Sequence, residues 1–335
     1  MTEFEIEKGI LFKYYGNSSH VVIPSNVKSI GNSAFSRCKS LTSIEIPNSV
    51  IEIGDYAFEG CTKLKSIVIP NSVINIGHRA FYNCNTLKSV EIPNSVEIIG
   101  CEAFRCCKNL TSIEIPNSVK IIAWKLFSDC IRLKSVTIPD SVTSIGEDAF
   151  EYCSSLTSIT IPNGVTSIGN AAFYGCRSLQ SITIPDSVAS IDYNAFYDCN
   201  NLTKIDISNS VARIGIRAFM EIRQPKPQYN DNGTLRAFKA FNNDWTCRDF
   251  QYEIGKSYHI EGKIKRCENG FHACMNPLNV FNFYSGELYF LRFAEVEISG
   301  EMDFDEAKAA ASDIKIIREL TVQELFEIYN SMEKV

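Results

Sequence analysis

The chain has 335 residues, of which 45% are hydrophobic, and its formal net charge at pH 7 is −6. This length and composition are typical of one or two folded domains. The acidic balance argues against a broad phosphate-binding surface, so we expect no nucleic-acid partner. No apolar run reaches the ~18 residues that a membrane-spanning helix needs, so we expect no membrane span.

Residues 1–17 are expected to cap one end of a larger structure. Phe4–Ile6 and Ile10–Tyr14 alternate like edge strands, with charges at intervals that discourage end-to-end association. The acidic start lacks the apolar stretch of a secretory signal. Together with many apparently unpaired cysteines, this favours a cytoplasmic location. The alternative is the cell surface or secretion, if a signal has been removed.

A 23-residue unit recurs from Ser18 to Ile222 without insertion. One copy is residues 156–178, and leucine, phenylalanine and cysteine return at its fixed phases. A period this strict predicts a solenoid, in which each coil stacks on the last and none buries its apolar side alone.

Within the unit, Leu156–Ile161 is predicted to be a short strand with leucine and isoleucines inward and serine and threonine outward. Pro162 ends the strand because it has no N–H to donate. Gly169 permits a sharp corner. Residues 172–176 then form a compact helical turn, whose phenylalanine fills the core.

The string Ile-Pro-x-x-Val-x-x-Ile-Gly-x-x-Ala-Phe-x-x-Cys resembles the leucine-rich repeats of the BspA-like, or Treponema pallidum-type, class. The resemblance covers residues 18–222, about 60% of the chain. It implies a leucine-rich-repeat solenoid of parallel strands and short helical turns. Protein or surface binding follows from it less directly, since a scaffold does not determine a ligand.

One coil, residues 110–132, departs from the pattern with Ala123 in place of glycine, Trp124 beside it and Leu126 in place of alanine. We expect local repacking there; the alternative is a functional tryptophan.

The cysteine column from Cys38 to Cys199 is expected to hold buried free thiols that act as small core hydrophobes. The alternative, bridges between coils, needs side chains that converge, whereas stacked side chains are parallel.

The outward positions of the first strand in each coil are the candidate binding surface, which we expect to be the concave face. Its N-terminal half is charged and its C-terminal half is rich in hydroxyl groups. One interpretation is a surface that binds a protein partner, with the charged half steering association. The other is a solvated face of small β-formers. The candidate residues are Glu45, Lys65, Lys88, Glu91, Glu114, Lys134, Thr137, Thr160, Thr183 and Asp206.

Two prolines and an Asn/Gly cluster in residues 224–233 predict a linker. It would separate a solenoid at 1–223 from a small α+β domain at 234–335. A capping box at Thr321–Glu324 predicts the start of a final helix. The other elements expected in this domain are strands at 235–241, 257–264, 289–298 and 314–317, and a short helix at 305–311.

The phrases at 240–256 and 267–274 resemble an uncharacterised domain of phage and bacterial proteins, a resemblance that implies no known activity. A possible site here comprises side-chain types that bind zinc: Cys247, Cys267, His272 and Cys274. No Cys-x-x-Cys spacing occurs, so we predict no metal, buried cysteines, and His272 hydrogen-bonded in a turn made by Gly270. Zinc is the alternative.

The run from Gly270 through Tyr284 to Glu297 is similar to degenerate ADP-ribosyltransferase-like sequences. This resemblance implies that His272 and Tyr284 contact a nicotinamide nucleotide and that Glu297 is the acid. The diagnostic Ser-Thr-Ser and paired-glutamate motifs are absent, as are the phosphate-binding glycine motifs. We therefore predict a non-enzymatic protein-interaction or adhesion-type scaffold without a cofactor. The alternative is an enzyme in the C-terminal domain that the solenoid targets. The sequence does not indicate the oligomeric state.

Overall fold

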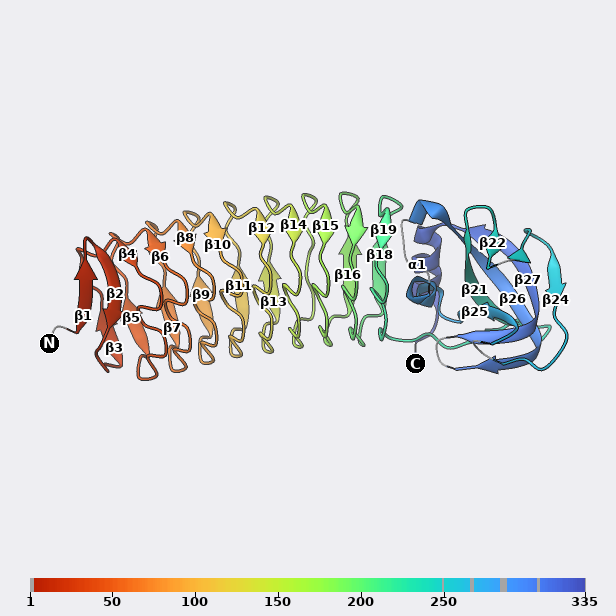
Figure 1. The fold of residues 1–335 in the computed structure, drawn as a ribbon, viewed down its shortest axis with the longest axis horizontal. Helices are drawn as coiled ribbons and strands as arrows, with labels where there is room; N and C mark the ends of the chain where they lie inside the picture. The colour runs from red at the N-terminus through yellow and green to blue at the C-terminus, as the bar shows by residue number, and fades with distance from the viewer. Residues whose placement is uncertain (1–2, 249, 266–267, 284–287, 306–307, 335) are drawn as a thin grey trace.

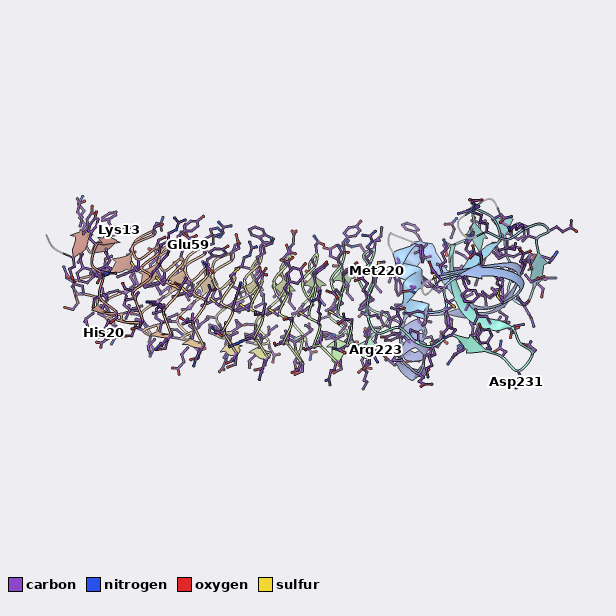
Figure 2. All side chains as sticks on the ribbon, turned by 90° about the horizontal axis from the view of Figure 1, so that it is seen from below. Lys13, His20, Glu59, Met220, Arg223 and Asp231 are labelled. Atoms are coloured by element: carbon purple, nitrogen blue, oxygen red, sulfur yellow. The ribbon has the colours of Figure 1, made fainter. Side chains whose placement is uncertain are left out.

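The protein is a row of stacked coils followed by a small sheet domain. The computed structural model describes residues 3–248, 250–265, 268–283, 288–305 and 308–334. In Figure 1 the coils follow one another from the N-terminal hairpin to β19, and the C-terminal sheet lies beyond α1. In Figure 2 the side chains project outward along the whole row, and Met220 and Arg223 mark its last coil.

The antiparallel hairpin of β1 (Phe4–Glu7) and β2 (Ile10–Tyr14) begins the solenoid, at the two predicted edge strands. Each later coil contributes two short parallel strands, except coil 156–178, which contributes only the second. The first strands are β3 (His20–Val22), β5 (Ser43–Glu45), β7 (Ser66–Val68), β9 (Ser89–Glu91), β11 (Ser112–Glu114), β13 (Ser135–Thr137), β16 (Ser181–Ile184) and β18 (Lys204–Ile207). The second strands are β4 (Ser29–Ile30), β6 (Glu52–Ile53), β8 (Asn75–Ile76), β10 (Ile98–Ile99), β12 (Ile121–Ile122), β14 (Ser144–Ile145), β15 (Ser167–Ile168), β17 (Ser190–Ile191) and β19 (Arg213–Ile214).

The strand predicted at residues 156–161 is only partly correct. Its apolar side chains are buried and its serine and threonine are exposed, as the alternation predicts. It is not paired as a strand, however, and its backbone hydrogen bonds to the two neighbouring coils are long. The bonds from Thr157 N to Lys134 O and from Gln180 N to Thr157 O are each 3.4 Å long.

Two columns of side chains fill the interior of the coils. The phenylalanine rings from Phe35 to Phe219 stack nearly parallel, with neighbouring centroids 5.2–5.9 Å apart. The cysteine column lies beside them, and every described cysteine is a free thiol. From Cys61 onward, each column thiol donates to the phenylalanine carbonyl 26 residues earlier, as Cys61 Sγ does to Phe35 O at 3.1 Å. The column therefore makes hydrogen bonds between coils as well as apolar contacts.

The helical turns predicted before each cysteine take the form of successive i→i+3 turns. Ser36 N bonds to Ser33 O and Cys38 N bonds to Phe35 O, both at 3.1 Å. Ser33 has a φ of 59°, and its counterparts in the later coils are also left-handed. This conformation costs an L-residue roughly 1–2 kcal/mol. It directs the Ser33 N–H to Asp55 O of the next coil, 2.8 Å away, so the cost is offset by a bond between coils.

Coil 110–132 interrupts the second-strand ladder between β10 and β12. The Phe104 and Phe127 centroids are 5.9 Å apart, compared with 5.2 Å for Phe81 and Phe104. Gly146 N bonds to Ile122 O at 2.8 Å, whereas no such bond joins Ala123 N to the coil before it in the described structure. The local repacking predicted for this coil is therefore an opening of the ladder.

The two substitutions in this coil account for the opening. At the corner position, a Cβ on Gly146 would lie 2.7 Å from Ile122 O, so coils approach too closely there for most side chains. Ala123 has a Cβ at that corner. Asp192 has one too and still bonds to Ile168 O at 2.9 Å, so the corner alone is not sufficient. Leu126, fully buried where other coils have alanine, adds the volume that separates the coils.

The C-terminal domain is a strongly bent antiparallel sheet in the order β20-β21-β26-β27-β24, with β25 also paired to β27. Residues 224–233, predicted as a linker, contribute β20 to this sheet. The elements are β20 (Gln228–Tyr229), β21 (Leu235–Asn242), β22 (Thr246–Cys247), β23 (Phe250–Gln251), β24 (Ser257–His259), β25 (Phe271–Ala273), β26 (Leu291–Phe304), β27 (Ala309–Leu320), the 3-10 helices η1 (Pro277–Asn282) and η2 (Leu288–Phe290), and α1 (Val322–Ser331).

Two expectations for this domain need correction. The helix predicted at 305–311 is wrong for residues 309–311, which begin strand β27. Alanine favours helix, but these three alanines are fully buried and pair with β25 and β26, so tertiary packing overrides propensity. The strand predicted at 257–264 is shorter, ending at His259. The final helix has the predicted capping box, with Thr321 and Glu324 bonded reciprocally.

Helix α1 closes the C-terminal end of the solenoid. Phe326 packs edge-on against Phe219, the last ring of the ladder, at 5.1 Å. The Asn330 side chain bonds to both the N–H and the C=O of Ile205, each at 2.9 Å, as a further strand would. The apolar core consequently runs without a break from the coils into one face of the C-terminal sheet, while the other face has a core of its own.

Candidate functional site

The first-strand face consists of the outward side chains on and just before the first strands of the coils. The ten predicted binding residues all lie on it; nine are exposed and Asp206 is partly buried. Parallel in-register pairing places Glu91 beside Val68, and Glu114 beside Thr137. Within each pair of first strands, β3 with β5, β7 with β9, β11 with β13 and β16 with β18, equivalent positions of neighbouring coils therefore lie side by side.

The charges on this face are unevenly paired. Glu45 is 3.3 Å from His20 Nε2, and Asp206 is 3.4 Å from Lys204 Nζ. Glu91 and Glu114 have no ion-pair partner in the described part of the chain. Val68, 69% exposed, lies between the glutamate-bearing strands in a shallow hollow of about 680 Å³. The N-terminal half thus presents Glu91, which has no ion-pair partner in the described chain, beside an exposed apolar residue, and a second such carboxylate at Glu114.

A second candidate site is a pocket of about 430 Å³ in the C-terminal domain, between β21, β25 and the segments around them. Its walls combine aromatic rings with basic side chains. The residues that line it are Phe238, Lys239, Asn242, Cys247, Arg248, Phe250, Tyr252, Ile260, Gly270, Phe271, His272, Ala273, Cys274, Val280, Phe283 and Lys308.

Three of the four predicted C-terminal site residues meet in this pocket: Cys247, His272 and Cys274. Burial raises the pKa of Cys274 to about 12. Burial is the largest cause that lowers the pKa of His272 to about 4, and the nearby positive charges of Lys308, Lys239 and Arg248 lower it further. This imidazole is therefore neutral at pH 7. Cys267 lies outside the described residues. Within the described ranges, no group of three or more His, Cys, Asp and Glu side chains is arranged to hold a metal ion.

The residues suggested by the ADP-ribosyltransferase-like resemblance are not all brought together. His272 lines the pocket, but Glu297 does not; it lies on β26 and accepts a hydrogen bond from Asn230 at 3.0 Å. Tyr284 is outside the described part of the chain.

Sequence reasoning missed the basic residues of the pocket, above all Lys239. This lysine is only 4% exposed, and its Nζ donates to His272 O at 2.9 Å. Burial is the main cause that lowers its pKa. The sequence feature that could have indicated it is a single lysine within the apolar strand Leu235–Phe241. A strand that is buried on both faces leaves a charged side chain away from water, so the charge needs hydrogen-bond partners or a counter-ion.

Family comparisons agree with both halves of the fold. The BspA type leucine rich repeat region, in 6 copies, matches residues 6–134 and 120–244. A domain of unknown function, DUF7666, matches residues 235–328. No curated protein is detectably similar to the chain. In the described structure, no helix has the length and apolar character needed to cross a membrane.

Several solved structures resemble the solenoid. A leucine rich cell surface protein from Faecalibacterium prausnitzii is 34% identical, over 64% of this chain and 70% of its own, with a TM-score of 0.53. A leucine-rich repeat protein from Bacteroides ovatus is 28% identical, over 64% and 76%, with a TM-score of 0.47. The T. pallidum leucine rich repeat protein is 30% identical, over 58% and 82%, with a TM-score of 0.44.

The repeat, the stacked coils and the matched residues lead to one assignment. The repeat family matches well over half of the chain, and the predicted resemblance is confirmed. This protein is a member of the BspA-type leucine-rich repeat family, and its solenoid carries a C-terminal domain of unknown function.

Proposed function

We propose that the chain is a non-enzymatic protein-interaction or adhesion scaffold, and that a protein partner binds its first-strand face. The observation that supports this most is the pair Glu91 and Glu114, exposed on neighbouring coils without ion-pair partners in the described chain. Two carboxylates on successive first strands, β9 and β11, complement a partner with a basic patch. Such complementarity acts mainly on the association rate and on specificity.

The cell surface is the place of action that we propose. The similar Faecalibacterium prausnitzii protein is described as a cell surface protein. Free cysteines are unusual outside the cell, but those of the column are protected. Burial raises the pKa of Cys61 to about 12 and that of Cys84 well above its usual value. Because the thiolate is the reactive species, such thiols resist oxidation. Protease treatment of intact cells should digest the chain; full protection would contradict the proposal.

Charge reversal on the face provides the test of binding. Proteins retained by the immobilised chain would be purified, and their association with the wild type and with Glu91→Lys/Glu114→Lys measured at low and physiological salt. We expect the variant to associate about tenfold more slowly at low salt, since attraction becomes repulsion and salt screens both. Its melting temperature should be nearly unchanged because both positions are exposed.

The matched control is Thr160→Lys/Thr183→Lys, which adds the same side chains to the hydroxyl-rich half of the face. This control should bind normally if the acidic half is the contact. Unchanged binding by the glutamate variant would place the contact elsewhere on the chain and contradict the proposal.

A further inference from the structure

Among the described residues that line the C-terminal pocket, those with a charged side chain at pH 7 are basic. Lys239 comes from β21, Arg248 from the segment after β22, and Lys308 from the segment before β27. No aspartate or glutamate is among the described residues that line it. The nearby Asp305 carboxylate accepts a hydrogen bond from the Lys308 backbone N–H at 2.9 Å. A hollow with one sign of charge and low-dielectric walls concentrates ions of the opposite sign.

Lys239 is buried without a carboxylate partner among the described residues. Its Nζ bonds to His272 O and lies 5.6 Å from the Phe241 ring and 5.7 Å from the Tyr252 ring. The Cys247 and Cys274 thiols and the Arg248 guanidinium are also near it. A buried charge without a counter-charge is costly, and a bound anion would supply that counter-charge.

The walls of the pocket are aromatic. The ring centroids of Phe250 and Tyr252 lie 4.7 Å apart, and the Phe271 ring packs edge-on against both rings. Phe283 also lines the pocket, with Lys308 Nζ 4.7 Å from its ring centroid. Aromatic walls with a few converging polar groups and a volume of about 430 Å³ fit a small organic molecule.

We propose that this pocket binds a small planar molecule that bears an anionic group, such as an aromatic ring with a phosphate or carboxylate. The ring packs between the aromatic side chains, while Lys239, Arg248 and Lys308 contact the anion. This binding is independent of the first-strand face, which lies on the coils.

Pyridoxal 5′-phosphate is a suitable probe because it combines a planar ring, a phosphate and an aldehyde. The unprotonated Lys239 amine would attack the aldehyde carbon, the carbonyl oxygen would leave as water, and added borohydride would reduce the imine to a stable secondary amine. Pyridoxal has the same ring without the phosphate, but its aldehyde is largely closed as an internal hemiacetal. The labelling of Lys239 by each probe is therefore expressed relative to that of the exposed Lys263, which lies outside the pocket lining. Mass spectrometry of peptides from the full chain would measure labelling at Lys239.

We expect about tenfold more labelling of Lys239 by the phosphorylated probe than by pyridoxal, a difference of ~1.4 kcal/mol in binding. Arg248→Gln and Lys308→Gln should lower the labelling to the pyridoxal level. Lys256→Gln, an exposed lysine of the same domain outside the pocket, is the matched control and should have no effect.

Competition distinguishes the two kinds of anion. Protection of Lys239 by inorganic phosphate would indicate a phosphorylated ligand, and protection by benzoate would indicate an aromatic carboxylate. Trp245 fluorescence would verify that each variant is folded. Equal labelling by the two probes, no labelling of Lys239, or labelling insensitive to both Gln variants would overturn the proposal.

Discussion

Each inner phenylalanine of the core ladder, from Phe58 to Phe196, is packed between the phenylalanine rings of the two neighbouring coils, so its loss affects three coils. Phe150 is fully buried, with Phe127 at 5.5 Å and Phe173 at 5.3 Å. We expect Phe150→Ala to lower the free energy of unfolding by about 3–5 kcal/mol, because neighbouring coils cannot close the cavity. Urea unfolding measures this, with the exposed Thr160→Ala as control. A loss below about 1 kcal/mol would contradict the stacked packing.

The buried thiols of the column, from Cys61 to Cys199, are expected to differ in reactivity from the few cysteines that are partly exposed. Burial raises the pKa of the column thiols, as for Cys176 and Cys199. Cys38, Cys101, Cys106 and Cys247 are partly exposed. Titration at pH 8 should therefore modify only a few thiols of the folded protein, and most of the 13 after denaturation without reductant. Five or fewer after denaturation would establish disulfides.

At the scale of elements, coil 110–132 is the irregular point of the solenoid. The amides of Lys120 and Ala123 make no backbone bond to the coil before them in the described structure, whereas Thr143 N bonds to Lys120 O and Gly146 N to Ile122 O. We expect Lys120 and Ala123 to exchange amide hydrogens faster than Thr143 and Gly146. The measurement is native-state hydrogen exchange resolved by residue.

Restoring the consensus provides the control for this prediction. Ala123→Gly/Leu126→Ala gives the coil the residues that its neighbours have, so the ladder should close and exchange at residues 120–123 should slow. Uniform exchange along all the coils of the wild type would mean that the ladder is not open here.

Within the cap formed by α1, the Asn330 side chain makes the hydrogen bonds that a further strand would make. Asn330 satisfies the N–H and the C=O of Ile205, which would otherwise form the open edge of β18. We expect Asn330→Ala to cost about 1–3 kcal/mol, since it leaves partly buried backbone groups without partners. Thermal unfolding gives the measure, and Glu327→Ala, exposed on the same helix, is the control. Equal melting temperatures for the two variants would argue against capping.

At the scale of the whole molecule, the solenoid and the C-terminal domain share one apolar cluster. The chain has two tryptophans, one in each region, so each can report separately. In Trp124→Phe the fluorescence comes from Trp245 alone, and in Trp245→Phe it comes from Trp124 alone. We expect the two fluorescence midpoints in urea to agree, once the stability change of each variant has been measured by circular dichroism and subtracted, because loss of α1 uncovers the last coil. A Trp245 transition that is complete before that of Trp124 begins would show independent domains.

Much of this fold follows from the sequence because its contacts repeat. In a solenoid each coil contacts only its neighbours. The equivalents of Phe173, Cys176 and Leu179 recur every 23 residues, and this recurrence specifies how each coil stacks on the next. The alternation along each first strand predicts its exposed face in the same way. The capping box at Thr321 is likewise local, since its two hydrogen bonds join residues three apart.

Only the tertiary structure decided the features that depend on residues far apart in sequence. The three alanines at 309–311 are a strand because β25 and β26 pair with them. Lys239 and Lys308 converge on one pocket although 69 residues separate them (308 − 239). Asn330 meets Ile205 across 125 residues. No local pattern encodes such contacts, because burial and pairing are set by which segments pack together.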